Sequence, residues 1–301
     1  MDKKDRLDAF GIFSLIAVGA LLGFNQVVIK VVNEGLQPVF FAGLRSAGAT
    51  VCVAGWMWLR GISLWPRAGT RVAGVLIGLV FSAEFVFLFL ALDLTSVSRT
   101  SVIFYSMPLW MALGAHVFLP DQKINRPKAL GLLLAFAGVA VAILDRPDGG
   151  DASLLGDLCA LGAALGWAGS ALMARATVLR EETPEMQLLW QIAISAPILL
   201  GVSVFFGPLI RELAPIHLWG LAFQIVIVVS AAFVFWLWLL SIYPPASVAA
   251  YGFLGPIFGV GFGWLLLGEQ VGSSILIALA LVAGGLYLIN RPPCSQVPQK
   301  V

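Results

Sequence analysis

The stretch SAEFVFLFLALDLTSVSRTSVIFYSMP, residues 82–108, returns as SAAFVFWLWLLSIYPPASVAAYGFLGP at residues 230–256 without a gap. The two stretches are offset by 148 positions and match from the Ser-Ala pair at the start to the proline at the end. Further along, Gln122 matches Gln270, and each half closes with an Arg-Pro pair, at 146–147 and at 291–292. The sequence therefore predicts two homologous halves, residues 1–147 and 148–301.

The composition places both halves in a membrane. The chain has 301 residues, of which 60% are hydrophobic and 11% are charged, and its mean hydropathy is +0.96. Soluble domains are about 45–50% apolar and about 25% charged, so a cytosolic enzyme, a nucleic-acid binder and a secreted disulfide scaffold are all excluded. Three widely separated cysteines and two histidines offer neither a disulfide framework nor a metal site. We expect no cofactor.

The apolar runs are long enough to cross a bilayer. A spanning helix needs about 20 mostly apolar residues. The first run is too long for the hydrophobic core of a signal peptide, so it is predicted to stay in the mature protein. Ten runs satisfy this criterion, at 9–32, 37–59, 69–92, 97–119, 127–145, 153–175, 186–206, 216–241, 246–268 and 272–290.

The positive charges predict the orientation of these spans, because Lys and Arg are enriched in cytoplasmic loops. With the N-terminus inside, thirteen Lys and Arg lie on the inner side: Lys3, Lys4, Arg6, Arg60, Arg67, Arg71, Lys123, Arg126, Lys128, Arg175, Arg180, Arg291 and Lys300. Four lie on the outer side: Lys30, Arg99, Arg146 and Arg211. We therefore expect both termini in the cytoplasm of a cell whose inner membrane holds the protein.

The repeat and the span count together predict an inverted architecture. Five spans in each half are an odd number, so the second half enters the membrane upside down relative to the first. Many secondary transporters are built from such inverted repeats, with the substrate site near the midplane between the halves. The sequence thus predicts an all-helical membrane protein of ten helices in two inverted five-helix repeats.

These features resemble the drug/metabolite transporter superfamily, EamA type. The resemblance is carried by the inverted halves, by Arg45 in the second span, and by the segments 108–122 and 256–270, of which Gly255-Pro256-Ile257-Phe258 to Gly268-Glu269-Gln270 is most typical. It implies a small-metabolite transporter of the inner membrane, often an exporter. Within that group the sequence is similar to amino-acid exporters, including those of aromatic amino acids.

Two ionisable residues stand out inside the spans, Arg45 and Glu84, and charges at such depth mark functional sites by default. Both lie about 12 Å below the outer end of their spans at 1.5 Å per residue, with Asn25 and Tyr105 at a similar level. One layer could bind a zwitterion, with Arg45 on a carboxylate and Glu84 on an ammonium group. The alternatives are a purely structural ion pair between Arg45 and Glu84, and proton coupling through Glu84.

Further candidates follow from the repeat. Phe24 and Trp167 occupy matching positions, and Gln191 aligns with Arg45. Tyr251 is a weaker candidate for the substrate site. The matching prolines 108 and 256 predict a bend in the fourth span of each half, either as a gate hinge or as a fixed kink. Gly255, Gly259 and Gly263 form a four-residue repeat typical of close helix packing, and Asp121 and Glu269 are expected to cap loops.

The predicted function is therefore secondary transport of small amphiphilic metabolites across the inner-membrane bilayer by alternating access, in the export direction that the resemblance implies, with amino acids, including aromatic ones, as the first choice. The cavity is expected between spans 1, 3, 4, 6, 8 and 9, with spans 5 and 10 as outer scaffold. No sequence motif for ATP binding or hydrolytic catalysis is present, and no enzymatic activity is expected. An intramembrane lipid-modifying enzyme and a non-transporting membrane sensor remain as alternatives.

Overall fold

The computed structural model describes residues 7–119, 124–145, 153–243, 248 and 251–290. Within these ranges every regular element is a helix. Asp121, Gln122, Arg146 and the Arg-Pro pairs of the repeat lie outside the described residues. The α-helices are α1 (Ala9–Gly35), α2 (Pro38–Leu59), α3 (Arg71–Leu94), α4 (Val97–Phe104), α5 (Met107–Phe118), α6 (Arg126–Leu144), α7 (Leu154–Ala176), α8 (Pro184–Val202), α9 (Pro215–Phe223), α10 (Ala232–Ile242), α12 (Leu254–Leu267) and α13 (Ser273–Asn290).

Shorter helical elements connect several of these helices. They are the 3₁₀-helices η1 (Val178–Glu181), η2 (Ser203–Phe205) and η4 (Tyr251–Phe253), and the π-helix η3 (Gln224–Ala231) between α9 and α10. In the π segment the Ser230 hydroxyl donates to the carbonyl of Ile225 at 2.7 Å, five residues back. π segments are rare and occur often at functional sites.

Eight helical segments are long and apolar enough to cross a membrane, and two shorter apolar ones, Tyr251–Leu267 and Ser273–Ile289, follow them. α4 and α5 together form one such segment, and so do α8 with η2 and α9 with η3 and α10. The all-helical membrane class is therefore confirmed. The outward faces are apolar, with Val51, Trp58 and Trp264 exposed at 74%, 73% and 62%, as expected of helices whose solvent is lipid.

The sequence explains where the helices begin. The side chains of Asp8, Asn125 and Thr183 accept hydrogen bonds from backbone N–H groups three residues later, at 2.9, 3.0 and 3.2 Å. These are N-caps, which satisfy N–H groups that have no partner within the helix. Pro38 and Pro184 occupy the first turns of α2 and α8, where a missing N–H breaks no hydrogen bond.

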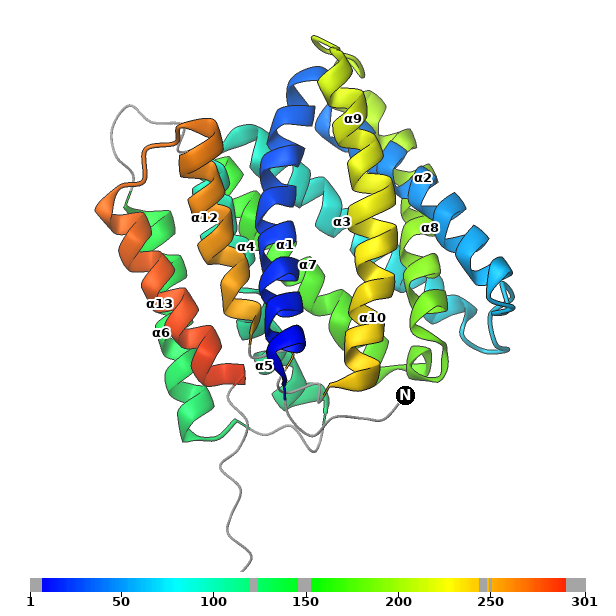
Figure 1. Ribbon diagram of the computed structural model, residues 1–301, viewed down its shortest axis with the longest axis horizontal. Coiled ribbons are helices and arrows are strands. Elements are labelled where there is room, and N and C mark those ends of the chain that lie inside the picture. The colour runs from blue at the N-terminus through cyan, green and yellow to red at the C-terminus, as the bar shows by residue number, and fades with distance from the viewer. Residues whose placement is uncertain (1–6, 120–123, 146–152, 244–247, 249–250, 291–301) are drawn as a thin grey trace, which may run out of the picture.

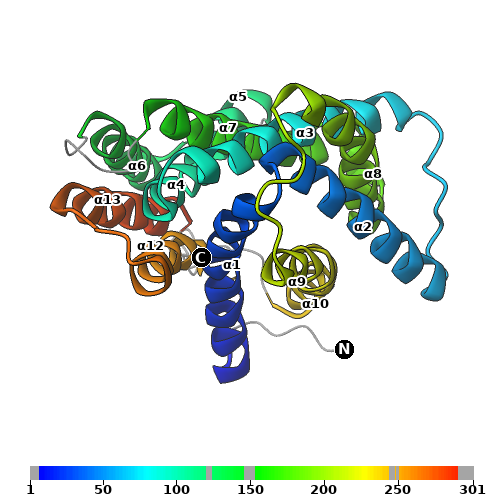
Figure 2. The same ribbon diagram turned by 90° about the horizontal axis from the view of Figure 1, so that it is seen from above.

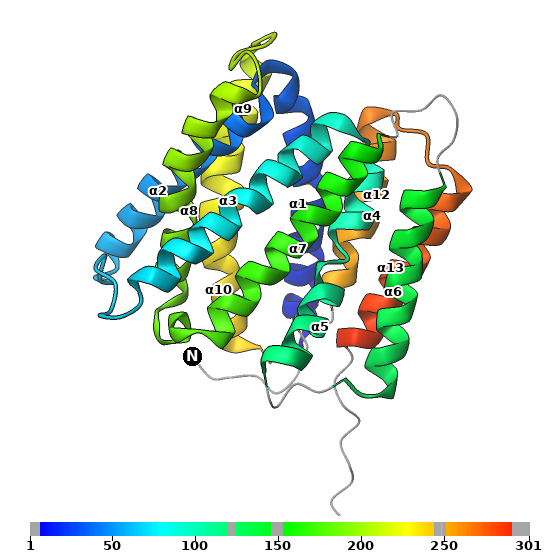
Figure 3. The same cartoon turned by 180° about the vertical axis from the view of Figure 1, so that it is seen from behind.

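The helices form two packed groups with α1 beside both. α3 packs on α2, α7 and α8, α2 also packs on α8, and α3 and α7 run side by side across the bundle (Figure 3). α6 packs on α13 at one edge, and α4 packs on α12 next to them (Figure 2). α1 packs mainly against α12. The start of α1 and the end of α13 lie at the same end of the bundle (Figure 1).

Small residues allow the closest helix contacts. At the α6–α13 seam, a Cβ on Gly131 would lie 2.7 Å from the carbonyl oxygen of Gly285, and one on Gly285 would lie 2.5 Å from that of Gly131. The backbones of α6 and α13 therefore touch at this seam.

The glycine ridge of α12 packs against α4. Gly255 lies under the Tyr105 ring, Gly259 under Ser101, and Gly263 beside Ser98 and Glu269. The close packing predicted for this ridge is confirmed, because a side chain at these positions would overlap α4 or the loop that follows α12.

Pro108 and Pro256 do not lie inside bent helices as expected. The chain leaves the helix at Tyr105 and Ser106, and Pro108 stands in the first turn of α5. Pro256 similarly stands in the first turn of α12, directly after η4. Proline is tolerated in a first turn because no backbone hydrogen bond is lost there. Each proline thus begins a helical segment, and the break lies just before it.

Candidate functional site

Arg45 is buried in the middle of the bundle, two turns from the start of α2, with 5% of its surface exposed. Its guanidinium lies 4.1 Å from the centre of the Phe85 ring and 5.5 Å from that of Phe89. Phe81, Phe85 and Phe89 are spaced four residues apart on α3, with successive ring centres 4.4 and 5.8 Å apart. The charge is therefore held by a ladder of aromatic faces, which attract cations.

Glu84 is adjacent to Phe85 in sequence but lies about 100° further round α3, because an α-helix has 3.6 residues per turn. It is 2% exposed and faces α7. A Cβ on Gly166 of α7 would lie 2.8 Å from the Glu84 Cβ, so this glycine admits the carboxylate between the two helices. Ser170 follows Gly166 by one turn and also lies near the Glu84 carboxyl.

Arg45 Nε is buried and has no hydrogen-bond partner among the described residues. The Glu84 carboxyl lies within electrostatic reach of Arg45 and has the Ser170 hydroxyl as a hydrogen-bonding neighbour. The described chain contains no direct ion pair between Arg45 and Glu84, so the two charges attract each other without contact. Most buried polar groups in proteins are hydrogen-bonded, and a buried cationic donor without a partner is typical of a site that receives a polar ligand.

A second polar group lies between α1 and α4. The Ser101 hydroxyl donates to Gln26 Oε1 at 2.7 Å. Tyr105 ends α4 with 5% of its surface exposed, and a Cβ on Gly255 would lie 2.6 Å from its Cε1 atom. Gln26 was not expected from the sequence, although it is next to the candidate Asn25.

A third group joins α1 to the π segment. Gln224 Nε2 donates to Asn25 Oδ1, while Gln224 Oε1 is buried and has no partner within the described part of the chain. The neighbouring Phe24 ring meets Phe223 and Phe262 edge to face, with centres 5.7 and 5.9 Å apart. Among the described residues, no ring contact joins Phe24 to its repeat mate Trp167.

The polar candidate side chains therefore form three local groups instead of the expected single layer. No hydrogen bond within the described chain links one group to another. Trp167 is half-buried and packs against the core that contains Phe85. Gln191 donates to the carbonyl of Gln187 in its own helix at 3.0 Å. Tyr251 stacks on Phe253, with ring centres 6.5 Å apart. Among these candidates, Arg45 and Glu84 lie within electrostatic reach of each other across α2 and α3.

Sequence analysis missed a buried ion pair. Arg99, expected among the cations at the outer end, is 4% exposed and contacts Asp157 through Nη2 at 2.6 Å and through Nε at 3.1 Å. It also donates to the carbonyls of Ala142 and Asp145, at 3.2 Å to Asp145. Asp157 lies inside an apolar run, and an acidic residue in such a run was the sequence signal that could have indicated a buried ion pair. The pair joins α4, α6 and α7.

Glu269 caps a helix of the other half. Its carboxylate accepts from the backbone N–H groups of Val97 and Ser98 at 2.6 and 2.9 Å, and from the Ser98 hydroxyl at 2.6 Å. A carboxylate at a helix N-terminus is favoured by the helix dipole. Glu269 was expected to cap a loop; instead it caps the N-terminus of α4.

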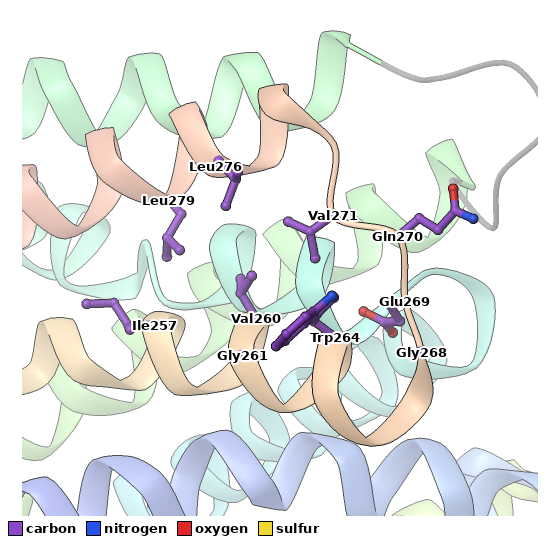
Figure 4. A pocket seen from close by; sticks show the side chains of 10 residues that line it. All are labelled: Ile257, Val260, Gly261, Trp264, Gly268, Glu269, Gln270, Val271, Leu276 and Leu279. Atoms are coloured by element: carbon purple, nitrogen blue, oxygen red, sulfur yellow. The ribbon is translucent and has the colours of Figure 1, made fainter.

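A surface groove of about 670 Å³ lies between α12 and α13 (Figure 4). Its lining includes Trp264, Glu269, Gln270 and Leu276, and none of the candidate substrate-binding residues contributes to it. Trp264 and Leu276 are exposed at 62% and 53%, so the groove faces outward. Neither the groove nor any other part of the described chain gathers three His, Cys, Asp or Glu side chains that could hold a metal ion.

Comparison with known proteins identifies the family. The model of the EamA-like transporter family matches residues 9–144 and again residues 154–291. The chain is 24% identical over 277 residues to "Uncharacterized transporter YoaV" of Bacillus subtilis (strain 168), covering 91% of this chain and 94% of that protein. It is 25% identical over 300 residues to a "Probable amino-acid metabolite efflux pump" of Escherichia coli (strain K12), covering 96% and 95%.

Among solved structures, one chain titled "Crystal structure of protein" has a TM-score of 0.66 and 18% sequence identity. The similarity covers 91% of this chain and 95% of that one. At this identity the likeness supports the fold alone.

Proposed function

The chain belongs to the EamA-like transporter family, and we propose that it exports small amphiphilic metabolites, most of all amino acids, across the inner membrane by alternating access. Its relatives are named transporters and efflux pumps, not enzymes. The relative named as an amino-acid metabolite efflux pump supports the substrate class.

We propose ten crossings in two inverted halves, residues 1–147 and 148–301, with both termini in the cytoplasm. The match of one family model to two successive segments supports the two halves. The thirteen-to-four bias of Lys and Arg supports the orientation. Two apolar helices shorter than the others complete the ten. An odd number of spans in each half makes the halves inverted, and inverted halves can exchange inward-open and outward-open shapes.

One observation carries the substrate proposal: Arg45 buries its Nε without a hydrogen-bond partner in the described chain, within electrostatic reach of the buried Glu84 carboxyl and the neighbouring Ser170 hydroxyl. A guanidinium matches the geometry of a carboxylate, while Glu84 and Ser170 can accept hydrogen bonds from an ammonium group. A zwitterionic amino acid supplies both groups. The aromatic ladder beside Arg45 offers apolar surface for the substrate's side chain.

Other candidates lie along the proposed route. Phe24, Asn25, Tyr105 and Trp167 are proposed as contacts beyond the central group, while Gln191 and Tyr251 are occupied by local contacts and are left out. The breaks before Pro108 and Pro256 are proposed as the hinges. α6 and α13, packed together at one edge (Figure 2), serve as scaffold.

The experiment uses purified protein in liposomes and three labelled compounds: phenylalanine, its amide, and 3-phenylpropionate. The amide lacks the carboxylate and the acid lacks the ammonium group. Wild type should transport phenylalanine best. Arg45→Gln should remove the preference for phenylalanine over the amide, and Glu84→Gln should remove the preference over the acid, because each variant deletes one matched charge.

Matched controls change the same residue types outside the proposed site. Arg60→Gln alters the exposed end of α2, where Arg60 lies 5.3 Å from the Trp56 ring, and Glu34→Gln alters an exposed position on α1. Both should transport like wild type. The substrate proposal is wrong if folded wild-type protein moves none of the three compounds, and the site assignment is wrong if Arg45→Gln and Glu84→Gln keep full selectivity.

A further inference from the structure

One end of the molecule carries a set of polar contacts that all converge on the end of α3. Arg211, between α8 and α9, donates to both carboxylate oxygens of Asp93 at 2.7 and 3.0 Å. Asn33 Nδ2 donates to the carbonyl of Phe89 at 3.0 Å. Lys30 Nζ donates to the carbonyl of Thr95 at 2.8 Å. We refer to these six residues as the α3 clamp.

Chemistry favours donors at this position. The C-terminal end of the helix dipole attracts cations. Two of the three donors, Arg211 and Lys30, are cations. The hydrogen bonds that Arg211 donates to Asp93 are the main reason why the pKa of Arg211 lies above its ordinary value, so Arg211 stays charged.

The donors are held together as one unit. The segment around Ile210 pairs with the α1–α2 turn in a short antiparallel bridge, Leu36 opposite Ile210. Gln37 N–H donates to the carbonyl of Leu209, and Arg211 N–H to that of Gly35, both at 3.0 Å. Arg211 also donates to the carbonyl of Asn33 at 2.8 Å. Arg211 from the second half is thereby fixed to the end of α1 in the first.

The other end of α1 has different neighbours. Tyr243, at the end of α10, donates to Asp8 Oδ1 at 2.6 Å, and a Cβ on Gly19 would lie 3.0 Å from Leu254 of α12. In the described part of the chain, every hydrogen bond from the α1 side chains to α3 and its C-cap comes from Asn33 or Lys30. Within the described residues, side-chain hydrogen bonds therefore join α1 to α3 at the clamp end only.

We propose that the α3 clamp is the closed outer gate of the transport path. This inference rests on the proposed transport function and on the orientation in which the α3–α4 turn faces the outside. The clamp joins α1 and a loop of the second half to the end of the helix that carries Glu84. Its contacts are few and partly exposed, with Arg211 and Asp93 side chains 36% and 20% accessible. Such contacts can break and reform during each cycle.

The test measures opening directly and needs no substrate. Leu88 is 4% exposed and follows Glu84 by one turn on the same face of α3, between the binding group and the clamp. Leu88→Cys is placed in a chain whose three cysteines are replaced by alanine. A membrane-impermeant thiol reagent is then added outside intact cells, and the labelling rate is measured.

Arg211→Gln and Asp93→Asn should each label about fivefold faster than the parent chain, which corresponds to about 1 kcal/mol at 1.4 kcal/mol per factor of ten. The exchanged pair, Arg211→Asp with Asp93→Arg, should return the rate toward that of the parent chain. Arg60→Gln should label at the parent rate. Labelling after denaturation and thermal melting show whether each variant is folded. If Arg211→Gln does not accumulate, Arg211→Lys, which keeps the charge, replaces it in the labelling experiment.

Unchanged labelling in folded Arg211→Gln and Asp93→Asn overturns the gate, and so does an equal increase in Arg60→Gln. Transport of labelled compounds is measured separately. If labelling accelerates while none of the compounds moves, the gate stands and the substrate class is wrong.

Discussion

Replacement of Asp157 by Asn tests how strongly the buried ion pair holds the bundle together. The side chains of Arg99 and Asp157 are 5% and 0% exposed, and the carboxylate accepts from Arg99 Nε and Nη2 and from Thr95 Oγ1 at 3.1, 2.6 and 3.3 Å. Asp157→Asn leaves the guanidinium buried with carbonyl partners only. Removing one member of a buried pair costs about 3–5 kcal/mol, because the remaining charge is uncompensated.

The assay is thermal unfolding of the purified protein in detergent. About 1 kcal/mol moves the Tm of a domain of 150–250 residues by roughly 2–4 °C, so the Tm of Asp157→Asn should fall by roughly 10 °C. Arg99→Met combined with Asp157→Leu removes both charges and should recover part of this loss. Recovery is partial because the carbonyls of Ala142 and Asp145 lose their donor. A fall of less than about 2 °C in Asp157→Asn, about 1 kcal/mol or less, would refute the reasoning.

Three further predictions concern close contacts and the clamp. Gly259→Leu should prevent folded protein from accumulating, because its side chain would overlap Ser101. Gly261→Ala, with no neighbour within 4 Å of its added Cβ, should behave as wild type. Size-exclusion chromatography distinguishes the two variants, and normal elution of Gly259→Leu would contradict the packing of α12 on α4. Gly35→Ala should lower the Tm because its Cβ would overlap His217, and adding His217→Ala should restore the Tm; no rescue means that another contact is responsible. Labelling of the cysteine reporter under the clamp should accelerate between about 0.1 and 1 M salt, since salt screens exposed ion pairs, and a salt-independent rate would argue against a part for the ion pair.

The helices themselves were predictable because their signal is local. Each apolar run is long enough to span the bilayer, and caps such as Asp8 and Asn125 stand directly before the helices that they start. The break at Tyr105 was not predicted in this form, since the proline suggested a kink three residues later. The proline thus indicates roughly where the helix is interrupted, but not whether the interruption is a kink or a break.

The polar contacts were harder to predict because they depend on how helices rotate against one another. Arg99 and Asp157 lie 58 positions apart and meet only because α4 and α7 turn the right faces together. Arg45 could be identified as buried from its run alone. Its position over the Phe85 ring instead of on Glu84 depends on the rotation of α2 against α3, which no local pattern records.

The seam between α6 and α13 has a consequence for biogenesis. Gly131 and Gly285, whose backbones touch there, are separated by about 150 residues of synthesis, which takes roughly 8–30 s at 5–20 residues per second. Until the last helix leaves the ribosome, the glycine face of α6 lacks its partner helix. A chain that ends before α13 therefore leaves Gly131 without the close backbone contact that this seam supplies.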